Sequence, residues 1–138
     1  MPDSINVIVG TPTGSVADIQ EWQDGNVLQI DEAAATPGQN IEFNFINVKS
    51  IRRVALSMYY DGSAVHWIEI QLWNFTEAAW KTIWTFSTGL GLNYRYSDMP
   101  VSGVDFIDGS GNSKMRIYHP IGGNASHDSF IDYAALIT

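Results

Sequence analysis

Residues 65–86 read VHWIEIQLWNFTEAAWKTIWTF and hold four of the five tryptophans of the chain. Two runs in which the residues of one face alternate with those of the other flank the segment 74–79, and this pattern predicts a β-hairpin. In the first run the apolar face carries Ile68, Ile70 and Leu72. The opposite face carries Trp67, Glu69, Gln71 and Trp73. Aromatic rings mixed with short polar groups suit a surface that contacts a partner better than they suit a core.

The second run extends this mixed face, because directly opposed residues of a hairpin share a face. A loop over 74–79 places Trp73 opposite Trp80, Gln71 opposite Thr82, Glu69 opposite Trp84 and Trp67 opposite Phe86. The candidate contact residues of the hairpin are therefore Trp67, Glu69, Gln71, Trp73, Trp80 and Trp84. An alternative stays open, in which the rings belong to the core of a thin sandwich and the two faces are exchanged.

The strand predicted at 53–60 adds two residues to this candidate face. A five-residue connection, 61–65, aligns its apolar side chains with those of the hairpin, provided that the two strands are neighbours. This register places Tyr59 beside Trp67 and Arg53 beside Trp73, the latter as a cation–π pair. Arg53 and Tyr59 are therefore candidate contact residues as well.

Short strands recur along the rest of the chain. They are expected at 4–9, 26–31, 41–46, 93–96, 104–107, 114–119 and 130–137, while 15–22 fits a strand or one helical turn. The last strand is apolar on both faces, which suits a central position in a sheet. Eight to ten short strands predict an all-β antiparallel sandwich with jelly-roll topology. Residues 1–14 are expected to form an N-terminal arm or short first strand, and 15–138 a single domain.

Composition limits the classes of partner and chemistry. The net charge of −8 weighs against nucleic acid, whose binders concentrate Lys and Arg. The absence of cysteine excludes disulfides and thiolate metal sites. The N-terminus lacks the basic and apolar regions of a signal peptide, and no apolar run approaches the length of a membrane span. We therefore expect neither a nucleic-acid nor a membrane partner.

Catalytic motifs are not found in the sequence. It has no GxSxG elbow and no cysteine nucleophile, and the glycine spacing of 109–114, GSGNSK, is wrong for a phosphate loop. A glycosidase needs a pair of carboxylates. Glu69 is the best candidate for one, but no partner is marked in the sequence. The sequence predicts a protein without catalytic activity.

Metal motifs are incomplete. The segment 108–119 imitates a calcium loop, but its sixth position is Ser113 in place of Gly and its twelfth is His119 in place of Glu. A turn is the better interpretation. His119 and His127 lack a third ligand at a convincing spacing and are expected to be solvated or at the edge of the core. No cofactor is predicted, although a structural calcium held by loop Asp and Asn side chains is compatible with the sequence.

Three segments resemble a known fold family: HWIEIQLWN at 66–74, AAWKTIWTF at 78–86 and MRIYHPIGGNASHDSFIDYAAL at 115–136. Together they are similar to the second half of galactose-binding-domain-like jelly rolls, which include discoidin domains and several carbohydrate-binding modules. The resemblance implies a jelly roll and a sugar ligand. The chain departs from the discoidin pattern because it lacks the paired terminal cysteines, and no sugar-binding loop residue maps onto it.

The length and composition of the chain also resemble those of small accessory virion proteins of tailed bacteriophages. Like those proteins, the chain is a short, cysteine-free β-protein rich in Gly, Asn and Ser. The segments that carry the resemblance include YYDGSAVHWIEIQLWN at 59–74 and HPIGGNASH at 119–127. It implies assembly in the host cytoplasm and a place in the virion. Two roles follow from it, namely decoration of the capsid and contact with host glycans by a tail or fibre.

Two functional hypotheses result. The leading one is a capsid decoration or cement protein that assembles as a homodimer or homotrimer on the major capsid protein or another virion protein. Residues 1–14 would then lie across a neighbour as an added strand. The alternative is a carbohydrate-binding module of a tail or fibre, with Trp67, Trp73 and Trp84 as stacking platforms.

Overall fold

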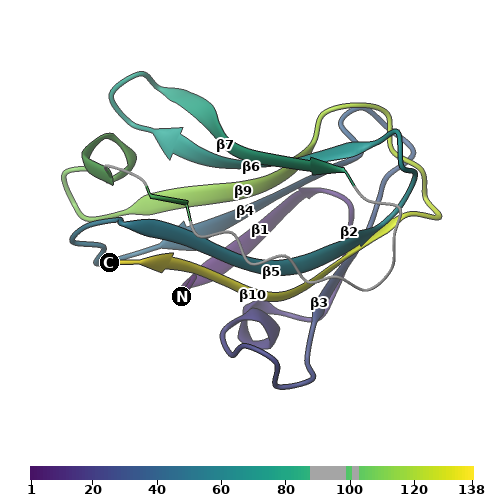
Figure 1. The fold of residues 1–138 in the computed structure, drawn as a ribbon, viewed down its shortest axis with the longest axis horizontal. Coiled ribbons are helices and arrows are strands. Elements are labelled where there is room, and N and C mark those ends of the chain that lie inside the picture. Colours follow the sequence, from purple (N-terminus) through teal and green to yellow (C-terminus); the bar gives the residue numbers. More distant parts are fainter. Residues whose placement is uncertain (88–98, 101–102) are drawn as a thin grey trace.

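Two five-stranded antiparallel sheets pack face to face in the computed structural model, which describes residues 1–87, 99–100 and 103–138 (Figure 1). Sheet A has the order β1 (Ser4–Val9), β4 (Gln39–Phe45), β9 (Ser113–His119), β6 (Trp67–Asn74) and β7 (Ala79–Ser87). Sheet B has the order β2 (Thr11–Thr13), β3 (Leu28–Asp31), β10 (Asp128–Ile137), β5 (Arg53–Asp61) and β8 (Met99–Pro100). This arrangement confirms the predicted antiparallel β-sandwich with jelly-roll topology.

The core lies between the inner faces of the two sheets. Side chains alternate along each strand, so every second residue points inward and is removed from water. Sheet A contributes Ile41, Phe43, Ile68, Ile70, Leu72, Met115 and Ile117. Sheet B contributes Leu28, Ile30, Val54, Leu56, Met58, Tyr60, Ile131, Ala134 and Leu136. The aliphatic face of β6 is therefore inward, as predicted, and the faces are not exchanged.

Strand β5 lies in sheet B, and its predicted pairing with the hairpin is wrong. It pairs with β10, with Leu56 opposite Ala134 and Met58 opposite Ile131. The apolar side chains of β5 and β6 therefore meet across the core instead of side by side in one sheet. The chain crosses from sheet B to sheet A in the connection 62–66, which is why matching the two apolar faces in one plane misplaced β5.

A β-bulge in the hairpin shifts the second half of its register. Gln71 lies opposite Thr82, as predicted, but Ile70 lies opposite Trp84, which leaves Ile83 as the extra residue. An extra residue on one strand exchanges the faces of everything beyond it. Glu69 is therefore opposite Thr85, not Trp84, and the ring of Trp84 turns to the core side.

The remaining predicted elements follow the sequence, with one difference among the described residues. Residues 15–22 contain the 3-10 helix η1 (Val16–Ile19), which the Ser15 and Asp18 side chains close as a capping box. The strand predicted at 104–107 is instead the 3-10 helix η2 (Gly103–Phe106). Strand β10 occupies the centre of sheet B, as its two apolar faces predicted. The strand predicted at 93–96 lies outside the described residues.

The N-terminal residues form one edge of each sheet. Strand β1 pairs with β4, and β2 pairs with β3. The chain passes from one sheet to the other at Gly10, whose φ of 115° lies in the left-handed region that favours glycine. A Cβ there would also lie 2.7 Å from the Ile30 Cγ2 atom. Among the described residues, no helix is long and apolar enough to cross a membrane.

The packing of the core predicts the effect of truncating Phe43, whose side chain is 0% exposed. Phe43→Ala removes apolar surface and leaves a cavity, so it should lower the free energy of unfolding by about 3–5 kcal/mol. Urea denaturation followed by tryptophan fluorescence measures this change. The control is Val65→Ala, at a side chain that is 77% exposed, where a change within about 0.5 kcal/mol is expected. Equal effects of the two variants would contradict the assignment of the core.

Candidate functional site

The outer face of sheet A collects aromatic and polar side chains from four adjacent strands. On β4, β6 and β9 each comes from a position next to a buried one, since alternation that buries one residue turns its neighbours outward. We call this surface the aromatic–polar face. Its residues are Glu42 on β4, Arg116 and Tyr118 on β9, Trp67, Glu69, Gln71 and Trp73 on β6, and Trp80 and Thr82 on β7.

Strand register aligns the polar residues in a row across the sheet. Glu42 pairs with Arg116, Arg116 with Gln71, and Gln71 with Thr82. The row crosses three strand spacings of about 4.8 Å, so it is about 14 Å long. Tyr118 lies opposite Glu69 in the next row. The polar groups are thus set side by side by backbone pairing and do not depend on a loop.

Hydrogen bonds link the centre of this row. The Arg116 Nε atom donates to the Gln71 Oε1 atom at 2.6 Å. The Gln71 Nε2 atom donates to the Glu69 Oε2 atom at 2.6 Å and to the Thr82 Oγ1 atom at 3.1 Å. Gln71 is buried although it faces outward, because its neighbours cover it. Such a network holds the side chains in one arrangement.

Glu69 is the acceptor on which the network converges. Its Oε2 atom also accepts from the Thr82 hydroxyl at 3.1 Å. Its Oε1 atom accepts from the indole N–H of Trp67 at 3.1 Å, which fixes the orientation of that ring. The best sequence-based candidate for a catalytic carboxylate is therefore engaged in positioning its neighbours.

Arg116 joins the polar row to the aromatic rings. Its Cζ atom lies 4.5 Å from the centre of the Trp80 ring and 4.1 Å from that of Tyr118, which are cation–π distances. Burial lowers the pKa of Arg116, while the charges of nearby groups, including Glu42 and Glu69, oppose that shift. A guanidinium stays charged in proteins despite such a shift. The face therefore combines a fixed cation with ring surfaces.

The tryptophans of the face are half-buried. Trp73 and Trp80 form a T-shaped pair, with ring centres 5.4 Å apart and an angle of 70° between the planes. This pair lies on one side of the polar row, and Trp67 and Tyr118 lie on the other. A half-buried ring held by neighbours presents apolar surface to a ligand with little loss of side-chain entropy.

The structure brings together most of the predicted candidate residues, but not all of them. Trp67, Glu69, Gln71, Trp73 and Trp80 share the aromatic–polar face. The other three, Trp84, Arg53 and Tyr59, lie elsewhere. The bulge turns Trp84 away from the face, and the position of β5 in sheet B removes Arg53 and Tyr59 from it. The first packs at the core side with its ring centre 4.8 Å from that of Phe86. The other two are in sheet B, where Tyr59 stacks on Phe130 at 5.0 Å.

Three residues of the face were not anticipated from the sequence: Glu42, Arg116 and Tyr118. The signal for two of them is present in KMRIYH at 114–119, since inward Met115 and Ile117 require outward Arg116 and Tyr118. What the sequence did not supply is the position of β9 between β4 and β6. A cation–π contact is present on this face, but Arg116 and Trp80 form it, whereas the sequence predicted Arg53 and Trp73.

Possible metal ligands lie at two other places. Asp108 forms a turn, as predicted, because its Oδ1 atom accepts from the backbone N–H groups of Ser110 and Asn112 at 2.8 Å each. These bonds lower the pKa of the exposed Asp108 carboxyl. Its oxygens are thereby used locally. The three histidines of the chain gather near Glu32 at one end of the sandwich. His119 and His127, expected to be solvated or at the edge of the core, are buried and partly exposed there, respectively.

Removal of the Glu69 carboxylate tests the network. Glu69→Ala takes an acceptor from the buried Gln71 amide and from the Trp67 indole, so it should cost about 1–3 kcal/mol of unfolding free energy. Glu77→Ala is the matched control, because Glu77 forms an exposed i,i+4 ion pair with Lys81, which is worth less than about 1 kcal/mol. Urea denaturation of both variants gives the comparison. A smaller effect for Glu69→Ala than for the control would contradict the network.

Comparison with known proteins supports the fold. No protein family profile and no curated protein sequence matches the chain. Among solved structures, it is similar to TmCBM61 in complex with β-1,4-galactotriose, with a TM-score of 0.56 and 12% identity over 96% of this chain and 87% of that one. It is also similar to CBM28, a carbohydrate-binding module specific for non-crystalline cellulose, with a TM-score of 0.54 and 16% identity over 87% and 79% of the two chains.

A third similar structure belongs to an enzyme. It is an active-site mutant of a family two carbohydrate esterase from Clostridium thermocellum, with a TM-score of 0.52 and 14% identity. All of this chain aligns, but it spans only 32% of the esterase chain. None of these findings supports a place in a phage particle. The chain has the jelly-roll fold of carbohydrate-binding modules.

Proposed function

We propose that this protein is a non-catalytic carbohydrate-binding module that binds a glycan chain across its aromatic–polar face. The observation that carries the proposal is the row of fixed polar groups with aromatic rings on both sides. A sugar ring has an apolar face of C–H groups and a rim of hydroxyls, so it needs both kinds of contact at once. Protein sites for small ligands combine them in the same way.

The rings supply the apolar contacts. Trp73 and Trp80 flank one side of the row, and Trp67 and Tyr118 flank the other. Their orientations are set by the T-shaped contact, by the bond from the Trp67 indole to Glu69 and by the packing of Arg116. Little side-chain entropy is then lost on binding, which favours affinity from a small contact area.

The polar row supplies donors and acceptors for sugar hydroxyls. Arg116 uses its Nε atom on Gln71, and a guanidinium carries four further N–H donors on its terminal nitrogens. The carboxylates of Glu42 and Glu69 supply acceptors on either side of it. The row of about 14 Å fits several consecutive sugar units better than a single one.

The likeness to carbohydrate-binding modules supports a glycan over a protein partner. Those proteins share the jelly roll with this chain and bind galactotriose or non-crystalline cellulose. Capsid decoration, homo-oligomer formation and a place in the virion stay predictions from the sequence, and no contact described above favours them. The glycan hypothesis therefore replaces capsid decoration as the leading one.

Binding to a panel of soluble polysaccharides tests the proposal. The panel contains β-linked glucans, galactans, mannans and xylans, measured by affinity gel electrophoresis and then by calorimetry. We expect retardation by at least one of them and no release of reducing ends. Trp80→Ala and Arg116→Ala should each weaken that binding at least tenfold, since each removes a ring or the cation of the face.

Trp22→Ala is the matched control. Trp22 is exposed, at 55%, whereas Trp80 is half-buried; Trp22 follows η1 and lies outside the aromatic–polar face. This variant should bind as tightly as the unchanged protein. Absence of binding across the whole panel would overturn the proposal, as would equal loss of affinity in Trp22→Ala and Trp80→Ala.

A further inference from the structure

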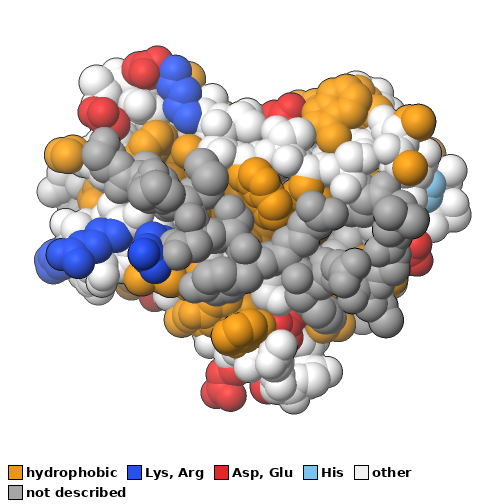
Figure 2. Space-filling model, in the orientation of Figure 1, with side chains coloured by type: hydrophobic (Ala, Val, Ile, Leu, Met, Phe, Trp, Pro, Cys, Tyr) orange, Lys and Arg blue, Asp and Glu red, His pale blue; other side chains and the backbone are white. Residues whose placement is uncertain are grey.

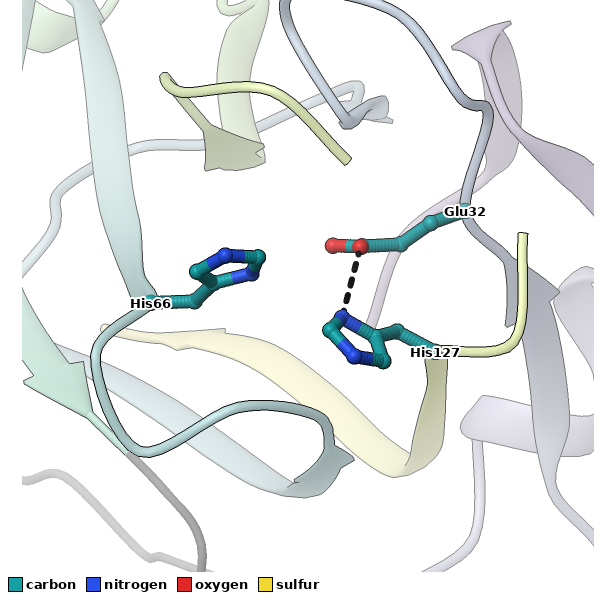
Figure 3. A group of neighbouring side chains, drawn as sticks. All are labelled: Glu32, His66 and His127. Atoms are coloured by element: carbon teal, nitrogen blue, oxygen red, sulfur yellow. Dashed lines mark ion pairs between the residues drawn. The ribbon is translucent and has the colours of Figure 1, made fainter. Parts of the chain in front are cut away.

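One end of the sandwich gathers all three histidines of the chain around one carboxylate. Glu32 follows β3, His66 precedes β6, His119 ends β9 and His127 precedes β10. These four residues are called the histidine cluster. They meet because β3 and β9 end where β6 and β10 begin. Figure 3 shows Glu32, His66 and His127 reaching toward one another from three separate segments, and in Figure 2 a histidine side chain is visible at the edge of this end.

The donor atoms of three members are close enough to share one ion. One ligand atom each from Glu32, His66 and His127 lies within 4.8 Å of the other two. The His127 Nδ1 atom is 3.4 Å from the Glu32 Oε2 atom. Zinc–ligand bonds of about 2.0–2.2 Å place tetrahedral ligand atoms about 3.4 Å apart. The present spacing therefore needs only a small inward movement of half-buried side chains.

Two members of the cluster are buried, and one of them keeps a ring nitrogen without a partner. Glu32 is 3% exposed and His119 is 0% exposed. Within the described part of the chain, the His119 Nε2 atom has neither a hydrogen-bond partner nor an ion-pair partner. The Glu32 Oε1 and His119 Nδ1 atoms lie 2.5 Å apart, which is the distance of an ion pair. A buried carboxylate is costly unless it is paired, and a cation at the cluster would add to the pairing that the imidazoles give Glu32.

Backbone hydrogen bonds hold the segments of the cluster in place. The N–H group of Glu32 donates to the carbonyl of His127 at 2.9 Å, and that of Gly38 donates to the carbonyl of His119 at 3.0 Å. The backbone N–H of Asn124 donates to the Glu32 Oε2 atom at 3.1 Å. A Cβ on Gly38 would overlap the His119 ring. The cluster is therefore built by close packing of three loops and does not result from flexible side chains meeting by chance.

The Tyr60 phenol contacts the two partly exposed imidazoles. The Tyr60 hydroxyl lies 3.2 Å from the His127 Nδ1 atom and 3.4 Å from the His66 Nδ1 atom. The imidazole rings of His66 and His127 are 5.1 Å apart, at 68° to each other. Outer partners of this kind set the orientation of metal ligands in known sites.

We propose that Glu32, His66 and His127 bind a zinc ion, with His119 and Tyr60 as positioning residues. His66 and His127 are partly exposed, so an ion can enter from solvent and one coordination position stays open to water. Two imidazoles and a carboxylate form a ligand set found for zinc. Calcium is disfavoured, because it takes six to eight oxygen ligands. The ion would join the ends of three strands, β3 and β10 of sheet B and β6 of sheet A.

Calorimetric titration of the tag-free, EDTA-treated full chain with zinc chloride tests this proposal. We expect one zinc per chain and a rise in the melting temperature that EDTA reverses. His66→Gln and His127→Gln should each weaken zinc binding by at least about 100-fold, because loss of even an outer partner costs about 10–100-fold. Melting curves in EDTA verify that both variants fold. Glu21→Gln, an exposed acid outside the cluster, controls for weak surface binding.

Cobalt provides a second readout. Cobalt(II) in place of zinc should give visible absorption bands of a site with nitrogen and oxygen ligands, and zinc should displace it. Both His variants should lose these bands while Glu21→Gln keeps them. Absence of stoichiometric zinc binding would overturn the proposal. So would zinc affinity in folded His66→Gln and His127→Gln equal to that of the unchanged protein.

Discussion

Burial of one face of every strand is the constraint on which the structure depends. Because side chains alternate, the residues that fill the core determine which residues face water. Ile68, Ile70 and Leu72 are fully buried or nearly so, and Glu69 and Gln71 between them must point outward. Ile117 in β9 imposes the same direction on Arg116 and Tyr118. The direction of the side chains on the aromatic–polar face is therefore set by the hydrophobic core on the opposite side of the same strands.

Local pattern was sufficient to predict the parts of the site that lie on a single strand. The faces of β6 and the Trp73–Trp80 pairing follow from a period of two and a short loop, and both are present in the structure. The place of β5 is a long-range property, since its apolar face is equally satisfied beside β6 or across the core from it. The bulge at Ile83 is also hard to foresee. The sequence signal of the bulge is that two apolar residues, Ile83 and Trp84, are adjacent, which breaks the alternation of apolar and polar residues along this strand.

The histidine cluster was beyond the reach of spacing arguments. His119 and His127 are eight residues apart, but Glu32 and His66 lie tens of residues away from them and from each other, so no short motif unites the four. They converge only when strands from both sheets end at the same place. The cluster and the aromatic–polar face are nevertheless neighbours along the chain. His66 precedes Trp67, and Tyr118 precedes His119, so alternation sends one side chain of each pair to each site.

Both chain ends emerge at the opposite end of the sandwich from the histidine cluster. Ser4 lies beside Asn44 and Ile137 beside Arg53, whereas His119 pairs with Gln39 at the far end of the same sheet. Figure 1 shows the N and C labels on the same side of the molecule. A tether or a neighbouring domain attached at either terminus would thus be connected to the end of the sandwich opposite the histidine cluster. The loops would point away from the anchor, and the broad side of sheet A would stay accessible along its length.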